Sequence, residues 1–401
     1  MHQFANIKKA LDASWPYWDA CEEAGLTDLV LSASRSDRAR VEGFDHPITN
    51  MSSYSYLGLD QDPRIVRAAA DALLREGTLN TTISRVRMRS ALLEEAEHGL
   101  GELFGATAIT TTSGAAAGWS VIPLAASGAL TGGTEPLMVF DKNAHFCLNA
   151  MKALAADEAP VVTIRHNDVE ELERLCASNA RVAYVADGVY STGGGAPVAE
   201  LHRLQEKYGL LVVYDEAHGI STVGARGVGW VLDQLGGLTQ NTIIIASLNK
   251  GFGASGGFVL FHPSLAAGRV EDLLLRNSGP IMWSQRINTA GLGGIVKSTE
   301  IHLSGEVDEL QAELNRKVAL FDSLIETGQR GDAFPIRTVM LGDEAEAVRV
   351  ASGLLAEGFY AAALFFPIVR RGVACLRVMI RANIPDAEIV RFGKELDRLR
   401  L

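Results

Sequence analysis

Short apolar runs recur along the first two thirds of the chain and alternate with longer amphipathic segments. Residues 63–76 and 91–104 have the spacing of charged and apolar positions that is typical of helices. The short runs are rich in β-branched residues and are bounded by glycine or proline, which is typical of buried strands in a parallel sheet. We expect such strands over residues 108–111, 136–140, 160–164, 181–185, 210–214, 242–246 and 256–261. The alternation predicts an α/β fold with a large, mostly parallel sheet.

The pattern changes after about residue 285. A long charged segment over residues 304–327 has helical spacing, and strand-like runs follow it at residues 336–341, 360–366 and 375–380. This pattern predicts a smaller α+β lobe, and a chain of 401 residues exceeds one ordinary domain. We therefore expect an N-terminal arm over residues 1–50, a large domain over residues 51–285 and a small C-terminal domain over residues 286–401.

Composition narrows the classes of partner. A hydrophobic content of 47% and forty glycines suit a well-buried α/β protein, and a net charge of -11 argues against nucleic acid as the main partner. No apolar run approaches the ~20 residues of a membrane helix. The first residues also lack the pattern of a signal peptide, so we expect a soluble, cytoplasmic protein without a membrane partner. The spacing of the four cysteines predicts free thiols and no metal site; they are Cys21, Cys147, Cys176 and Cys375.

Two apolar runs end in residues that bear chemistry. Asp215 ends one run, His218 follows three residues later, and Lys250 comes just after the next run. Ligands of open α/β sheets bind beyond the carboxyl ends of the strands, where these side chains would emerge. A carboxylate that pairs with a pyridinium nitrogen, together with a lysine that forms a Schiff base, is what pyridoxal phosphate (PLP) chemistry requires. Asp215 alone could be a helix cap and Lys250 alone a surface residue, but their combination favours the cofactor.

Other strand ends offer further contacts to PLP. Residues 113–115 follow a strand and open a helix, where small residues let backbone N–H groups approach a phosphate; an ordinary N-cap at Ser113 would explain the same residues. Ser247 is a second candidate for the phosphate, unless its hydroxyl bonds to nearby backbone. His145 would stack on the pyridine ring or lie on the surface, and Ser191 and His218 would contact the phenolic oxygen. The predicted phosphate contacts are Ser113, Gly114, Ala115 and Ser247.

Taken in order, these motifs resemble the α-oxoamine synthase family of fold-type I PLP enzymes over about residues 50–385. The family includes glycine C-acetyltransferase, 8-amino-7-oxononanoate synthase and 5-aminolevulinate synthase. The variants around His145 and Ser191 look most like its autoinducer synthase branch. The matching segments are Tyr56-Leu57-Gly58-Leu59, Asp141 to His145, Asp187 to Ser191, Asp215-Glu216-Ala217-His218, and Ser247 to Lys250.

The resemblance implies an aspartate aminotransferase-like fold, a homodimer and roles for individual residues. It implies that His145 stacks on the ring, Asp215 meets the pyridine nitrogen and Lys250 carries the Schiff base. Ser284 would give its hydroxyl to the phosphate of the partner subunit, and Arg377 would hold the substrate carboxylate, a natural bidentate task.

The substrate side departs from the family pattern. Ser55 stands where many members have asparagine, and Gly118 replaces another asparagine. After Gly77-Thr78, the segment up to residue 90 lacks the family's usual Gly-Thr and the later histidine before the Leu-Glu pair. The arginines in this segment would meet a phosphorylated co-substrate or form a solvated basic face; they are Arg85, Arg87 and Arg89.

We expect a PLP-dependent transferase that forms a carbon–carbon bond between an amino-acid-derived Cα carbanion and an acyl thioester. The alternatives are β,γ-elimination or γ-replacement on S-adenosylmethionine followed by bond formation to a non-thioester acceptor, or transamination.

Overall fold

The computed structural model describes residues 4, 7–33, 38–266 and 269–400. They form two compact units: unit 1 is Met1–Gln61, Thr192–Gly194 and Leu310–Leu401, and unit 2 is Asp62–Ser191 and Gly195–Glu309. The predicted arm and domains, with boundaries at residues 50 and 285, stay a prediction, because compactness does not test which parts fold alone. Residues 1–3 and 5–6, on which the expectation of no signal peptide depends, lie outside the described residues.

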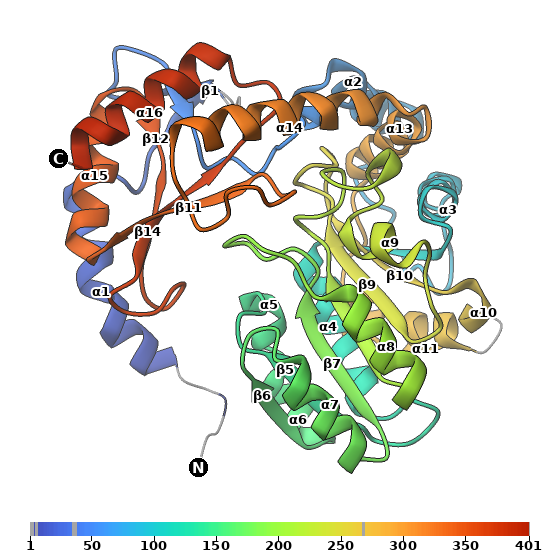
Figure 1. Cartoon of the computed structure of the whole chain (residues 1–401). Helices are drawn as coiled ribbons and strands as arrows, with labels where there is room; N and C mark the ends of the chain where they lie inside the picture. The colour runs from blue at the N-terminus through green and yellow to red at the C-terminus, as the bar shows by residue number, and fades with distance from the viewer. Residues whose placement is uncertain (1–3, 5–6, 34–37, 267–268, 401) are drawn as a thin grey trace. The chain divides into compact units, whose positions relative to one another are not determined.

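Unit 2 is built on a sheet with the strand order β4-β10-β9-β8-β7-β5-β6 (Figure 1). Strands β6, β5, β7, β8 and β9 pair in parallel, whereas β10 runs antiparallel to both β4 and β9. Each strand expected here begins within one residue of an observed strand, so the mostly parallel sheet is confirmed. The strands are β4 (Thr107–Thr111), β5 (Leu137–Asp141), β6 (Val161–Ile164), β7 (Val182–Asp187), β8 (Leu211–Asp215), β9 (Thr242–Ser247) and β10 (Gly257–Phe261).

Helices cover both faces of this sheet. The helical segments of unit 2 are α2 (Pro63–Glu76), α3 (Ala91–Phe104), α4 (Gly114–Ala126), α5 (Phe146–Asn149), α6 (Lys152–Glu158), α7 (Val169–Ser178), α8 (Val198–Tyr208), η2 (Ala225–Gly227), α9 (Trp230–Leu235), α10 (Pro263–Ala266), α11 (Val270–Asn277), α12 (Gly279–Trp283) and α13 (Thr289–Leu303). Alternate side chains of β8 enter two hydrophobic cores, one on each face of the sheet. Val212 and Tyr214 belong to the core that also contains residues of α3, α7, α8, α9 and α13. Leu211 and Val213 belong to the core that also contains residues of α4, α6 and α11. Burial on both faces explains why the strands are continuously apolar.

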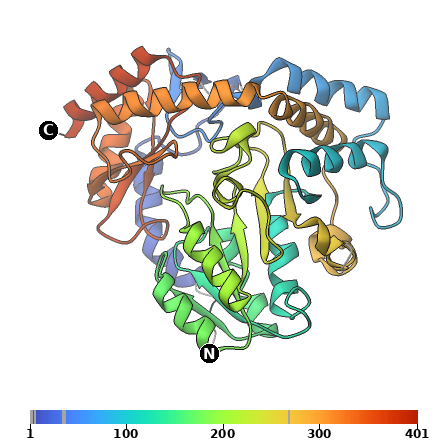
Figure 2. The same cartoon turned by 45° about the vertical axis from the view of Figure 1, so that its right-hand side comes forward.

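Local signals set the ends of the first two helices of unit 2. Asp62 caps α2 by accepting a hydrogen bond from the backbone of Arg64, and α2 ends at Gly77, whose φ of 65° lies in the left-handed region. Ser90 caps α3 in the same way. Both helices match the ranges predicted from the sequence. Figure 1 and Figure 2 both draw α2 beside α13, against which it packs.

Unit 1 combines residues from both ends of the chain. Its two sheets have the orders β1-β2-β3-β12 and β11-β14-β13, and the second is antiparallel. The predicted α+β character of the C-terminal region is confirmed. The elements are α1 (Ile7–Glu23), β1 (Leu31–Ala33), β2 (Arg38–Val41), β3 (Ile48–Asn50), η1 (Leu59–Gln61), β11 (Ile336–Gly342), α15 (Glu344–Ala356), β12 (Phe359–Tyr360), β13 (Ala362–Leu364), β14 (Ala374–Met379) and α16 (Asp386–Arg400).

Helix α14 (Glu306–Leu324) contains the boundary between the two units, which falls at Leu310. Among the described helices, none combines the length and the apolar composition that crossing a membrane requires.

Candidate functional site

The topology of unit 2 gathers the predicted cofactor residues along one edge of the sheet. Since β10 is antiparallel to both β4 and β9, strand β4 runs in the same direction as β5, β7, β8 and β9. Their carboxyl ends therefore lie at the same edge, where ligands of such sheets bind. The residues at or just after these ends are Ser113 (β4), His145 (β5), Ser191 (β7), Asp215 (β8), and Ser247 and Lys250 (β9).

Lys250 and His218 lie in direct contact at this edge. The Lys250 Nζ is 2.9 Å from the His218 Nε2. His218 is buried and Lys250 is partly buried. Thr222 Oγ1 donates to the His218 carbonyl at 2.9 Å, which stabilises the turn that carries this histidine. The lysine is therefore held by a buried neighbour and is not an ordinary surface residue.

Asp215 is linked to His145 through a cysteine. The Asp215 Oδ1 accepts a hydrogen bond from the Ala217 N–H at 3.0 Å, and Cys147 Sγ lies 3.7 Å from Asp215 Oδ2 and 3.0 Å from His145 Nδ1. Burial and the charge of Asp215 raise the pKa of Cys147, so its thiol stays protonated and donates. Sequence reasoning missed this role, although Cys147 stands only two residues after His145.

The same three side chains have the composition of a zinc site. His145 Nδ1, Cys147 Sγ and a carboxylate oxygen of Asp215 lie within 4.8 Å of one another. His145 and Asp215 are, however, two of the residues predicted to hold PLP. We therefore treat this group as part of the cofactor site.

Asp187 binds the backbone of the loop that carries His145. Its Oδ1 accepts from the His145 N–H at 2.9 Å, and the residue is only 2% exposed. Burial and the nearby charge of Asp215 raise the pKa of Asp187 well above the ordinary value of an aspartate. Asp187 therefore resists ionisation more strongly than an ordinary aspartate. The sequence motif contains Asp187, but only Ser191 was given a role from it.

The predicted phosphate cradle is a close contact of three backbone segments. Ser113 Oγ accepts from the Ala116 N–H at 3.1 Å, as an N-cap of α4 does. A Cβ at Gly114 would lie 3.2 Å from Ser247, and one at Gly257 would lie 2.6 Å from the Gly114 nitrogen. Small residues are therefore required here, which suits the approach of backbone N–H groups to an anion. Ser247 Oγ donates to the Asn249 side chain, and Ala115 is exposed, so a phosphate role for these residues stays a prediction.

Two further predicted cofactor residues follow β7 and α12. Ser191 is partly buried after β7, and Ser284 is exposed just after α12. The role of Ser284 depends on a second subunit, and both roles stay predictions.

The expected basic face at residues 85–89 is wrong for Arg85. This side chain is buried, pairs with Glu97 at 2.7 Å and donates to the Thr110 carbonyl at 3.2 Å. Arg85 therefore ties its loop to α3 and β4, because a buried guanidinium needs such partners. Arg87 and Arg89 are exposed, and Arg89 pairs with Glu94.

The predicted substrate residues belong to unit 1. Arg377, on β14, is partly buried, and its Nε is buried without a hydrogen-bond partner among the described residues. Burial lowers the pKa of Arg377, while Tyr56 opposes that shift. A guanidinium with unused donors is suited to a carboxylate. Ser55 is buried, and its hydroxyl donates to Asp60.

Glu216 is a buried acid, and its burial was not predicted from the sequence. It is 0% exposed, and a Cβ at Gly188, Gly219 or Gly229 would collide with its carboxyl group. Burial raises the pKa of Glu216 to about 8. Asp215 and Glu216 are therefore neighbours in the chain with different surroundings: Asp215 accepts a hydrogen bond from Ala217, whereas three glycines enclose the Glu216 carboxyl group. The pattern of apolar and polar residues along the chain does not reveal this difference.

Comparison with known proteins gives one family and one fold. The profile of aminotransferase class I and II matches residues 46–396. The 8-amino-7-oxononanoate synthase of Geobacter sulfurreducens is 29% identical over 389 residues, which cover 93% of this chain and 96% of that protein. The serine palmitoyltransferase of Sphingomonas wittichii superposes with a TM-score of 0.84 at 23% identity, covering 98% of both chains. A structure of SPT with a PLP internal aldimine also gives 0.84 at 23% identity, covering 97% of both. The predicted fold type is confirmed.

Proposed function

Because the chain belongs to the aminotransferase class I and II family, we propose that it is a PLP-dependent transferase that joins an amino-acid-derived carbon to the acyl group of a thioester. A relative that matches nearly the whole length of this chain is named 8-amino-7-oxononanoate synthase, a member of the family that the sequence motifs resemble. The observation that carries the proposal is the contact between Lys250 and His218 at the sheet edge that also holds Asp215.

The residues at this edge fit PLP. Lys250 would hold its aldehyde, Asp215 would pair with its ring nitrogen, and His145 would lie against its ring. The missing side chain at Gly114, next to Ser247, would let the backbone approach its phosphate. Bound PLP supplies an electron sink that stabilises negative charge at the α-carbon of an amino acid.

The chain itself supplies proton transfer and orientation. The Lys250 Nζ would move a proton at the substrate α-carbon, and His218 Nε2, which lies 2.9 Å from it, would orient that amine. Asp187 fixes the backbone at His145, which keeps the imidazole in place. Arg377, with its unused Nε, would bind the substrate carboxylate.

The partners proposed are an amino acid and an acyl thioester, and a homodimer and a cytoplasmic location remain proposals. The named relatives do not favour S-adenosylmethionine chemistry or transamination. The departures at Ser55, Gly118 and residues 77–90 bear on which amino acid and which thioester are used.

A substrate screen tests this function. Purified protein loaded with PLP is incubated with single amino acids and acyl thioesters, and free thiol is measured together with the mass of the product. The expected result is thiol release that requires both substrates and a product that contains carbon from both. Lys250→Ala is the control and should release no thiol above background.

Three outcomes would contradict the proposal. Methylthioadenosine formed from S-adenosylmethionine without a thioester would support the elimination chemistry. Return of the amino group by a keto acid would support transamination. PLP binding without any turnover across the screen would leave a non-catalytic protein.

A further inference from the structure

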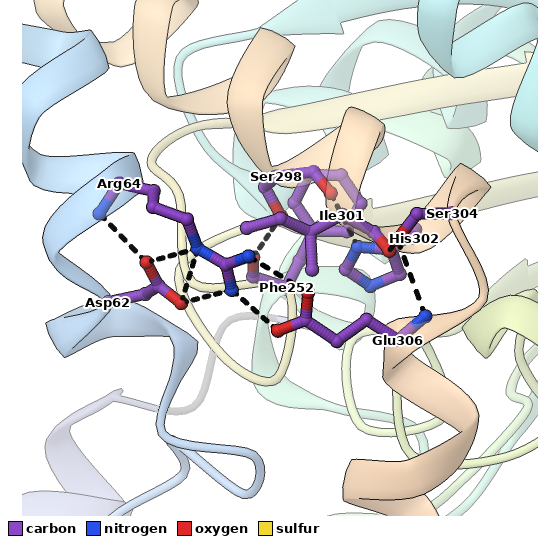
Figure 3. Close-up of polar contacts among 8 residues, drawn as sticks. All are labelled: Asp62, Arg64, Phe252, Ser298, Ile301, His302, Ser304 and Glu306. Carbon is purple, nitrogen blue, oxygen red and sulfur yellow. Dashed lines mark hydrogen bonds and ion pairs between the residues drawn. The ribbon is translucent and has the colours of Figure 1, made fainter.

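We propose that His302 is a positioning residue of this active site: from α13 it fixes, through Ser221 and Phe252, the two loops that carry His218 and Lys250. The inference rests on the proposed function only for its consequence in catalysis, because the contacts themselves belong to the chain. Figure 3 shows His302 with Phe252 and Ser298 at the end of α13.

His302 is completely buried, and both of its ring nitrogens have partners. Nδ1 lies 2.7 Å from the Ser298 carbonyl and Nε2 lies 2.8 Å from Ser221 Oγ. Because a carbonyl only accepts, Nδ1 carries the hydrogen and Nε2 must accept from the Ser221 hydroxyl. Burial lowers the pKa of His302 to about 4, so this neutral tautomer persists across the physiological range.

One loop is held through Ser221. This residue is 0% exposed, has a φ of 71°, and donates its N–H to the Gly227 carbonyl at 2.8 Å. A non-glycine residue in the left-handed region is strained and persists only where its surroundings fix it. Ser221 stands three residues after His218, and the next residue, Thr222, donates to the His218 carbonyl. The hydrogen bond from Ser221 to His302 therefore anchors the turn that carries His218.

The second loop is held through Phe252. Its ring stacks on the His302 ring with centroids 4.5 Å apart and planes inclined by 25°, and its carbonyl accepts from Ser298 Oγ at 2.5 Å (Figure 3). Phe252 stands two residues after Lys250 and is 1% exposed. A Cβ at Gly251 would lie 3.1 Å from Ser221, so the two loops also touch each other. One imidazole thus fixes both partners of the pair formed by Lys250 and His218.

The nearby ion pair of Arg64 with Glu306 provides a contrast at the same end of α13. The Arg64 Nη2 lies 2.6 Å from Glu306 Oε1, but the two side chains are 47% and 40% exposed. Such exposed pairs contribute little to stability. Glu306→Gln therefore serves as a control that alters the neighbourhood without touching His302, Ser221 or Phe252.

The experiment compares wild type with Ser221→Ala, His302→Phe, His302→Gln and Glu306→Gln. Ser221→Ala removes one hydroxyl, and His302→Phe keeps a ring on Phe252 but loses both hydrogen bonds. His302→Gln retains a side chain that can accept a hydrogen bond from Ser221. Hydrogen–deuterium exchange is measured in the cofactor-free protein over residues 216–223 and 248–254. The PLP dissociation constant and the pH midpoint of the bound-PLP absorption band are measured in the loaded protein.

We expect Ser221→Ala and His302→Phe to speed exchange in residues 216–223 by roughly tenfold, because a buried partner is left unpaired. They should also weaken PLP binding by roughly tenfold and move the pH midpoint, since the distance between Lys250 and His218 changes. His302→Gln should lie between His302→Phe and wild type, and Glu306→Gln should match wild type in every readout.

A purely structural role would lower the melting temperature but leave the pH midpoint where it is in wild type. The inference is overturned if Ser221→Ala, which is the variant least disruptive to folding, leaves loop exchange and the midpoint unchanged. If wild type fails to bind PLP, the proposed function fails, and exchange in the cofactor-free protein then decides this inference alone.

Discussion

The sheet edge of unit 2 and the Arg377 guanidinium of unit 1 differ in how many of their polar groups have hydrogen-bond partners. At the edge, Lys250 contacts His218, and Asp215 accepts from Ala217 and lies beside Cys147. In unit 1, the buried Nε of Arg377 lacks a hydrogen-bond partner among the described residues.

This difference separates two tasks. Groups that hold a resident cofactor are arranged by one another, so their geometry exists before binding. A group that binds a passing substrate retains donors whose partner arrives with the substrate, because a ligand gains affinity from satisfying them.

The largest effect is expected for Asp215→Asn compared with Asp187→Asn. Asparagine cannot keep a pyridine nitrogen protonated, so Asp215→Asn should lower kcat/KM by roughly a thousandfold. Asp187 accepts a hydrogen bond from the His145 N–H through Oδ1, and the side-chain oxygen of an asparagine can accept the same bond. Asp187→Asn should therefore stay within about fivefold of wild type. Equal losses in steady-state kinetics would show that the edge does not distinguish these two acids.

Glu216 is the exception at the edge, since its side chain is 0% exposed and the backbone N–H groups of Trp230 and Val231 stabilise its charged form less than burial opposes it. Burial raises its pKa from 4.5 to about 8 in the folded protein. The folded state therefore binds more protons than the unfolded chain, and stability falls as the pH rises through this interval. We expect Glu216 to remove about 2 kcal/mol of the free energy of unfolding between pH 6 and pH 8.

Urea denaturation of wild type and Glu216→Gln at these two pH values measures that loss. The glutamine side chain does not titrate, so the difference between the two proteins should shrink or reverse as the pH rises. A pH dependence that is the same in both proteins would mean that Glu216 is already ionised in the folded state.

Arg377→Lys tests the unused donors of unit 1. Lysine keeps the charge but cannot form the bidentate contact, so the KM for the amino acid should rise by roughly ten- to a hundredfold. PLP affinity should not change, because the residues that would hold PLP belong to unit 2. A change in PLP affinity with an unchanged KM would assign Arg377 to the cofactor instead.

The smallest effect is expected at Cys147. Serine retains a donor toward Asp215 and His145, so Cys147→Ser should stay within about threefold of wild type in kcat/KM. Cys147→Ala removes the donor and should cost about three- to tenfold. Identical kinetics for both variants would show that the thiol does not support Asp215.

The sequence predicted the parts of the molecule that depend on local pattern. Buried strands are continuously apolar because both faces of the sheet are covered, and this made β4 to β10 visible. Asp215 and Lys250 were found because they lie at or just after the ends of such strands, and a parallel topology then places them at one edge. The spacing of charged and apolar positions gave the ranges of α2 and α3, and the structure adds that Asp62 and Ser90 cap them.

Contacts between distant segments were not predictable in this way. Arg85 looked like part of a basic surface, but its burial depends on Glu97 and on the end of β4. The burial of Glu216 depends on three glycines from separate turns, and the role of His302 depends on Ser221, which lies 81 residues earlier in the chain. The pairing of β3 with β12 likewise joins residues more than three hundred positions apart.

The central claim is that the amine of Lys250 carries PLP. The most direct measurement is borohydride reduction of the PLP-loaded protein, followed by peptide mass mapping of wild type and Lys250→Ala. The account predicts a visible absorption band and a pyridoxyl label on Lys250 in wild type, with both absent from the variant. A label on another lysine, or a wild-type protein that saturating PLP leaves colourless and unlabelled, would contradict it.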